Sequence, residues 1–277
     1  MIQPMTNHIS RSLAWGIGYL RRSGNGATRT LVLLHGIGSN AGSFRALLTA
    51  LPETIDTIAW DAPGYGQSEP LAIAMPSPRD YADTLAKFLD ALGVSSVDLA
   101  GHSLGALFAA SFAKYYPDRV SALALISPAL GYGVVPGAAL PDGVQSRIDE
   151  IRELGPTAFA KKRAARLVGD PQARPEIVAA VQQAMGSVNP DGYVQAVYAL
   201  GAGQLLSDAA SITAPSIVAV GTLDQITPPK NARTAHAALA NAVGYREVTG
   251  AGHALPQEEP AALAHILAET TMGSVHV

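Results

Sequence analysis

The sequence of 277 residues predicts an α/β protein with a mostly parallel, doubly wound sheet and a helical insertion. Three observations favour this fold class. Short apolar runs alternate with segments of helical periodicity. Several of these runs are apolar throughout, which is typical of strands buried on both faces. One stretch, 129–208, breaks the alternation without a clear strand. Because parallel strands need crossover connections, we expect helices on both faces of the sheet.

The strands are predicted from the apolar runs and their boundaries. An early strand covers Ser12–Arg21 and ends at the Gly/Ser/Asn-rich turn Arg22–Gly26. Thr30–His35, with the sequence T-L-V-L-L-H, is a continuous apolar run. The remaining predicted strands are Asp56–Trp60, Val97–Ala100, Val120–Ile126, Ser216–Val220 and Tyr245–Val248. We expect Trp15 and Trp60 to be core residues.

Helices are predicted between these strands. Asp80–Leu92 carries apolar residues at helical spacing, and Gly93 follows where a C-terminal glycine is common. Ser43–Leu51 is stopped by Pro52. The other helices predicted beside the sheet are Leu104–Tyr116, Pro229–Leu239 and Glu259–Glu269.

The stretch 129–208 predicts a separate helical unit. Its helical segments are separated by Gly-Pro, Asp-Pro and Asn-Pro pairs and by Pro175. The predicted segments are Val144–Leu154, Thr157–Leu167, Glu176–Met185 and Gly192–Ala199. The domain prediction is therefore a sheet domain made of 1–128 and 209–277, with 129–208 inserted into it.

Composition excludes several classes of function. A hydrophobic fraction of 48% with only 15% charged residues is unlike a disordered chain. The net charge of −3 gives no basic field for nucleic acid or an anionic membrane. The absence of cysteine excludes disulfides, thiolate catalysis and cysteine-ligated metals, and the seven histidines form no metal-binding motif. With no apolar targeting segment at the N-terminus, we expect a soluble, cytoplasmic protein.

The pentapeptide Gly101-His102-Ser103-Leu104-Gly105 is the sharpest chemical signal. In the pattern G-x-S-x-G, a serine on a tight strand–turn–helix corner is exposed as a nucleophile. The alternative is a structural turn, since such a pentapeptide can arise by chance in a glycine-rich chain. The predicted strand before it and the predicted helix after it favour the nucleophile, Ser103.

A serine nucleophile needs a histidine base that is oriented by a carboxylate. Where a serine occupies such a corner, the acid and then the histidine follow along the chain. His253, in the loop Gly250-Ala251-Gly252-His253, follows the last predicted strand, whereas His236 and His265 lie in predicted helices and His276 in the terminal tail. Asp224 follows another strand end and is the predicted acid, although a turn aspartate is the alternative.

An oxyanion hole needs two backbone donors. The amide of Leu104 directly follows the nucleophile, and the amide of Ile37 lies in the glycine-rich loop after Thr30–His35. We expect these two amides to form the hole. Gly36 in the same loop and His102 beside the nucleophile are further candidates for substrate contact.

The motifs together resemble the α/β-hydrolase fold superfamily, close to its esterase, lactonase and carbon–carbon hydrolase members. The matching segments are L-L-H-G-I-G (33–38), D-A-P-G-Y-G-Q-S (61–68), G-H-S-L-G (101–105), G-T-L-D-Q-I-T-P (221–228) and G-A-G-H (250–253). The resemblance implies that 129–208 is a helical lid. Because position 103 is serine, dehalogenases and epoxide hydrolases with an aspartate nucleophile are excluded.

The predicted lid offers candidates for substrate binding. Arg163 and Arg166 lie in a basic run that either faces solvent or turns inward to bind a substrate carboxylate. Four further residues of the lid are large and apolar or aromatic: Tyr132, Met185, Tyr193 and Tyr198. They either pack the lid, which we favour, or line an apolar pocket.

The sequence therefore predicts a serine hydrolase that acts on a small carboxylic ester through an acyl-enzyme, as a monomer or small homo-oligomer, with no cofactor and no metal. We expect a small-molecule acyl substrate as its partner, and no nucleic acid or membrane. The alternatives are hydrolysis of a carbon–carbon bond or an enol-lactone in bacterial aromatic-compound breakdown, an amidase, and a non-catalytic binding protein on the same fold.

Overall fold

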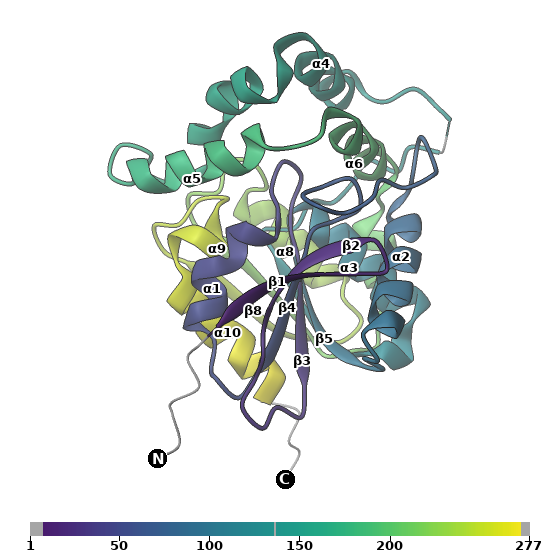
Figure 1. The fold of residues 1–277 in the computed structure, drawn as a ribbon, viewed down its shortest axis with the longest axis vertical. Helices are drawn as coiled ribbons and strands as arrows, with labels where there is room; N and C mark the ends of the chain where they lie inside the picture. Colours follow the sequence, from purple (N-terminus) through teal and green to yellow (C-terminus); the bar gives the residue numbers. More distant parts are fainter. Residues whose placement is uncertain (1–7, 136, 273–277) are drawn as a thin grey trace.

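The computed structural model describes residues 8–135 and 137–272, and Figure 1 shows its arrangement. The parts of the predicted sheet domain at 1–7 and 273–277, with His276, lie outside these residues. A single sheet runs in the order β1-β2-β4-β3-β5-β6-β7-β8. Its strands are β1 (Ile9–Ala14), β2 (Ile17–Arg22), β3 (Thr30–Leu34), β4 (Asp56–Trp60), β5 (Val97–His102), β6 (Val120–Ile126), β7 (Ser216–Gly221) and β8 (Ala242–Val248). All pairings from β4 to β8 are parallel, which confirms the predicted α/β class.

The first strand pair corrects the prediction of one strand over Ser12–Arg21. β1 and β2 form an antiparallel hairpin in which Ala14 pairs with Ile17. Trp15 and Gly16 form its turn with φ values of 48° and 72°. A two-residue turn with positive φ at both positions matches the twist of the flanking strands. Trp15 is therefore 51% exposed rather than in the core, whereas Trp60 is fully buried as predicted.

Helices cover both faces of the sheet. The helices outside the β6–β7 connection are α1 (Arg45–Ala50), α2 (Pro78–Ala91), α3 (Leu104–Tyr115), α8 (Pro229–Ala238), α9 (Leu255–Glu258) and α10 (Pro260–Met272), with 3-10 turns η1 (Ala41–Phe44) and η2 (Pro117–Arg119). Alternate residues of β3 divide between two apolar clusters. Val32 and Leu34 pack with α2 and α3, and Leu31 and Leu33 pack with α1 and α10. Burial on both faces explains why these strands read as continuous apolar runs.

The β6–β7 connection contains only helices among its described residues. They are α4 (Asp142–Arg163), η3 (Ala164–Leu167), α5 (Pro175–Gly186), α6 (Pro190–Ala202) and α7 (Leu205–Ala209). Because β6 pairs directly with β7, this segment leaves the sheet and returns to the neighbouring position. In Figure 1, α4, α5 and α6 lie together at one end of the molecule, beyond the sheet. Within α4, Gly155 has φ of 70°, at the break predicted between two helical segments.

None of the helices in the described residues is long and apolar enough to cross a membrane.

Candidate active site

Ser103 lies at the sharp corner between β5 and α3. Its backbone has φ 54° and ψ −115°, a region that non-glycine residues rarely adopt. Such a conformation is unfavourable by about 1–3 kcal/mol and persists where the surrounding structure enforces it. The Ser103 amide donates to the Ile126 carbonyl at 2.9 Å, and the Ser103 carbonyl accepts from Ala106 at 3.1 Å. The corner is thus held from β6 and from the first turn of α3.

The two glycines of the pentapeptide are required by close backbone approach. A β-carbon on Gly101 would lie 2.3 Å from the Gly105 carbonyl oxygen, and one on Gly105 would lie 2.2 Å from that of Leu34. Both distances are far inside van der Waals contact. The G-x-S-x-G spacing therefore reflects the packing of the corner onto β3 as well as its backbone freedom.

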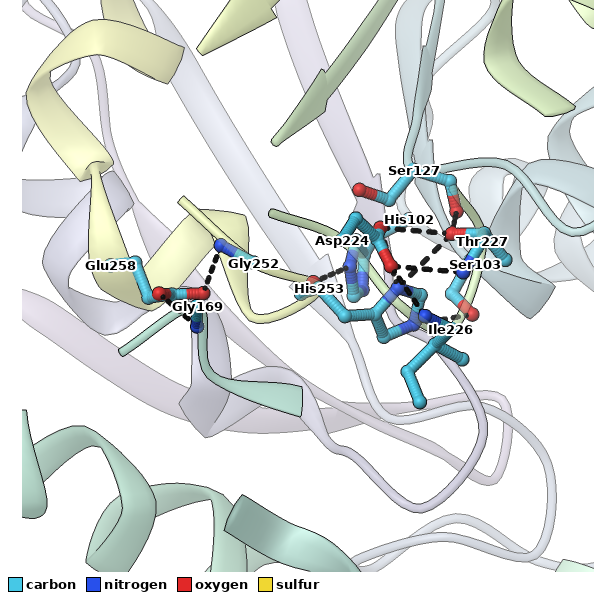
Figure 2. Close-up of polar contacts among 10 residues, drawn as sticks. All are labelled: His102, Ser103, Ser127, Gly169, Asp224, Ile226, Thr227, Gly252, His253 and Glu258. Carbon is cyan, nitrogen blue, oxygen red and sulfur yellow. Dashed lines mark hydrogen bonds and ion pairs between the residues drawn. The ribbon is translucent and has the colours of Figure 1, made fainter. Parts of the chain in front are cut away.

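The structure brings the three predicted catalytic residues into one hydrogen-bonded chain, shown in Figure 2. The Ser103 hydroxyl lies 3.0 Å from Nε2 of His253, and Nδ1 of His253 lies 2.9 Å from Oδ2 of Asp224. All three side chains are buried. They come from loops after β5, β7 and β8, which end at the same edge of the parallel sheet. Each distance lies within hydrogen-bonding range.

Asp224 is held as a carboxylate. Burial by itself raises its pKa, but the charge and hydrogen bond of His253 outweigh this effect and lower the pKa to about 2. The amides of Ile226 and Thr227 each donate to Oδ1 at 2.9 Å. With Oδ1 occupied by two donors, Oδ2 remains to accept the proton on Nδ1 of His253. That contact places the lone pair of Nε2 towards Ser103.

Thr227 is a site residue that the sequence reasoning missed. Its hydroxyl lies 3.0 Å from Oδ2 of Asp224, 3.1 Å from Nδ1 of His253 and 2.9 Å from the Ser127 carbonyl. A hydroxyl has one proton, and Nδ1 already donates to Asp224, so the proton goes to an oxygen of Asp224 or Ser127. Thr227 lay inside the motif 221–228, and its distance of three residues from Asp224 was the available signal.

Glu258 is a second residue that the sequence reasoning missed. Its buried carboxylate accepts from the amide of Gly252 at Oε1 and from that of Gly169 at Oε2, both at 2.9 Å (Figure 2). Burial raises the pKa of Glu258, and the two amides oppose that rise. Glu258 thereby ties the loop that carries His253 to the segment between β6 and β7.

The two predicted oxyanion amides lie beside Ser103. Both Ile37 and Leu104 line the cavity at Ser103. Within the part of the chain that the structure describes, neither amide donates a hydrogen bond. Leu104 begins α3, and the first amides of a helix have no acceptor within the helix. Gly36 permits this close approach, since a β-carbon there would lie 2.8 Å from Cβ of Ser103. Two unused donors beside a serine hydroxyl are suited to binding an oxyanion.

His102 is not among the residues that line the cavity at Ser103. Its Nε2 donates to the backbone carbonyl of His253 at 2.8 Å, and burial lowers its pKa to about 3, so that it is neutral. His35 shapes the oxyanion loop in a similar way. Its Nδ1 donates to the Gly36 carbonyl at 2.8 Å, and its Nε2 accepts from the Ala62 amide at 2.9 Å.

A cavity of about 310 Å³ opens at Ser103 between the sheet edge and the helices of the β6–β7 connection. From the sheet side it is lined by residues that include Ile37, Ser103, Leu104, Ile226, Thr227, Asn231 and His253. From the connection it is lined by residues that include Tyr132, Arg147, Phe159, Arg163, Arg166, Met185 and Tyr193. Of the predicted substrate-contact residues, Tyr132, Arg163 and Arg166 lie on this cavity. Gly36 and His102 instead line a neighbouring recess of about 30 Å³.

Comparison with known proteins identifies the family. Residues 29–260 match the sequence model of the alpha/beta hydrolase fold family, and the chain belongs to that family.

The chain is similar to several known proteins, of which three are described. The chain is 28% identical over 227 residues to pimeloyl-[acyl-carrier protein] methyl ester esterase from Chromobacterium violaceum, covering 81% of this chain and 87% of that protein. It is 34% identical over 135 residues to the dihydrolipoyllysine-residue acetyltransferase component of the acetoin cleaving system from Cupriavidus necator, but spans only 35% of that protein's length and 49% of its own. The enol-lactonase from Burkholderia xenovorans LB400 superposes with a TM-score of 0.83 at 21% identity, covering 95% of this chain and 99% of the other, which shows the shared fold.

Proposed function

We propose that this α/β hydrolase is a serine esterase that cleaves a small carboxylic ester through an acyl-enzyme. The observation that carries the proposal is the continuous chain from Ser103 through His253 to Asp224, beside two free amides in one cavity. The similarity to a methyl ester esterase, over 81% of this chain and 87% of that protein, supports ester substrates.

The geometry supports a two-step reaction. Oγ of Ser103 attacks the ester carbonyl while its proton passes to Nε2 of His253, and the carbonyl oxygen becomes an oxyanion between the amides of Ile37 and Leu104. Collapse of this intermediate breaks the bond to the leaving alkoxide, which takes the proton from Nε2. Asp224 stabilises the positive charge on His253 meanwhile.

The second step releases the acid. Water gives a proton to Nε2 and attacks the acyl carbon, and Oγ of Ser103 leaves with that proton. Every group that the two steps need is supplied by the chain or by water, so the mechanism involves no cofactor. A lactone is a cyclic ester, and the same steps would open it.

We also propose that 129–208 acts as a lid domain on a hydrolase domain of 1–128 and 209–277. Its helices supply one wall of the cavity at Ser103, and Gly169 is tied to the carboxylate of Glu258. A wall built from an inserted segment excludes water and selects substrates by size and charge.

The proposal is tested by hydrolysis of 4-nitrophenyl acetate, butyrate and octanoate by the wild type, Ser103→Ala and Ser111→Ala. Ser111 is a buried serine of α3 outside the cavity, so it controls for the loss of a hydroxyl. We expect turnover that falls with chain length, that is lost in Ser103→Ala, and that persists in Ser111→Ala.

A fluorophosphonate probe, located by mass spectrometry, distinguishes a hydrolase with another substrate from a non-catalytic binding protein. Labelling of Ser103 without ester turnover would move the proposal to another acyl substrate or to a carbon–carbon bond. A chain that neither labels nor turns over would be a binding protein on the hydrolase fold.

A further inference from the structure

The part of the cavity wall that the β6–β7 connection supplies is cationic. Three arginines line the cavity: Arg147 and Arg163 from α4, and Arg166 from η3. Among the described residues, no aspartate or glutamate lines it. An excess of positive charge in an enclosed site attracts anions, and the low dielectric of its walls strengthens that attraction.

Arg163 is already paired with a carboxylate. Its Nε donates to Oε2 of Glu150 at 2.6 Å, and Lys162 also pairs with Glu150. The Arg163 guanidinium also lies over the Phe159 ring, 4.8 Å from its centroid. These contacts fix Arg163 within α4 and leave it little freedom to bind a substrate.

Arg147 and Arg166 have no such partner. Within 8–135 and 137–272, no carboxylate lies within 4.0 Å of either guanidinium. Arg147 is half-buried and faces the hydroxyl of Tyr193, a buried side chain of α6. A half-buried charge without a counter-ion is less stable than a solvated one, and this argument applies to Arg147. Arg166 is exposed and reaches the cavity from its rim.

We propose that the substrate carries a carboxylate besides its ester, and that Arg147 and Arg166 bind this carboxylate while Arg163 is structural. The proposal rests on the proposed esterase function and specifies its substrate class. A guanidinium matches the planar geometry of a carboxylate with two parallel donors, which provides orientation as well as charge. Of the two arginines predicted from the sequence, Arg166 keeps its role and Arg147 takes the place of Arg163.

Two pairs of substrates test the proposal, each matched for size. Mono-4-nitrophenyl adipate and its methyl ester place the carboxylate on the acyl side. 4-Acetoxybenzoate and methyl 4-acetoxybenzoate place it on the leaving group. We expect the wild type to favour the free carboxylate over its methyl ester in at least one pair, and the preferred pair identifies the side of the ester that faces the arginines.

The variants are Arg147→Gln and Arg166→Gln, with Arg152→Gln as a control. Arg152 lies on the same helix as Arg147 but is exposed and outside the cavity. We expect each cavity variant to lower kcat/KM for the carboxylate substrate by about 10- to 100-fold, mainly through KM, as for a lost charge-assisted hydrogen bond. The neutral partner presents no carboxylate to either arginine, so its kcat/KM should fall much less than that of the carboxylate substrate. Both activities of Arg152→Gln should stay within about twofold of the wild type.

A second measurement keeps this proposal separate from the esterase proposal. Calorimetric titration of the Ser103→Ala variant with monomethyl adipate and dimethyl adipate reports binding without turnover. Preferential binding of the carboxylate, lost in Ser103→Ala/Arg147→Gln, supports the anion site even if no ester is hydrolysed. Hydrolysis of neutral esters without any carboxylate preference, together with equal binding of the two adipates, would overturn the anion site and leave the esterase proposal intact.

Discussion

Replacement of Asp224 by asparagine tests how the proposed triad sets the protonation of its histidine. Oδ1 of Asp224 accepts two backbone amides at 2.9 Å, so the asparagine carbonyl oxygen must occupy that position. Its amide nitrogen then lies where Oδ2 was, 2.9 Å from Nδ1 of His253. A donor at this position forces Nδ1 to accept, which moves the imidazole proton to Nε2. Nε2 then points a proton at Ser103 and cannot remove one.

The expected loss of activity is therefore large while the geometry stays intact. In serine proteases the corresponding substitution lowers kcat by about 10⁴ through the wrong tautomer, and we expect a similar loss here. The assay is kcat for 4-nitrophenyl butyrate at pH 7–8. Asp208→Asn is the control. Asp208 forms an ion pair with Lys114 at 2.8 Å, and neither residue lines the cavity. An Asp224→Asn enzyme with kcat within tenfold of wild type would refute the tautomer argument.

The same variant predicts a change in the pH dependence of stability. The folded-state pKa of Asp224 is lowered from its usual 3.8 to about 2, so ionised Asp224 stabilises the fold above pH 4. That stability is lost as the pH falls from about 4 to about 2. At about 1.4 kcal/mol per pKa unit, the contribution is about 2 kcal/mol. Urea titrations at pH 7 and pH 3 should show a smaller pH effect in Asp224→Asn, and an unchanged effect would assign the acid sensitivity to other groups.

Two further substitutions probe the residues that hold the triad in place. Thr227→Val removes the hydroxyl donor beside Asp224, so kcat should fall about 10-fold with little change in KM, and Thr227→Ser should restore it. Equal losses in the valine and serine variants would indicate a packing role instead. Glu258→Gln places an amide donor against the amide of Gly252 or Gly169 and loses one charge-assisted hydrogen bond, about 2 kcal/mol. The melting temperature should fall by about 4–8 °C in calorimetry, together with kcat, and an unchanged melting temperature would contradict a role for Glu258 as a tie.

Local sequence determined most of the scaffold and the identities of the proposed triad. The strands at Asp56–Trp60 and Val120–Ile126 have their predicted bounds, because burial on both faces requires an unbroken apolar run. The triad residues could be predicted from spacing because each lies directly after a strand, and parallel strands end at one edge of the sheet.

Only the tertiary structure decided the details that depend on distant contacts. The turn at Trp15 was missed because tryptophan rarely adopts a positive φ, and pairing between β1 and β2 enforces it here. Glu258 was missed because its partner Gly169 lies 89 residues away. The basic run in the sequence pointed to Arg163, but the folded chain pairs Arg163 with Glu150, and this contact is the reason that the proposed anion site uses Arg147 instead. Periodicity reports which face of an element is buried, whereas the neutralisation of a buried charge depends on which carboxylate the folded chain brings beside it.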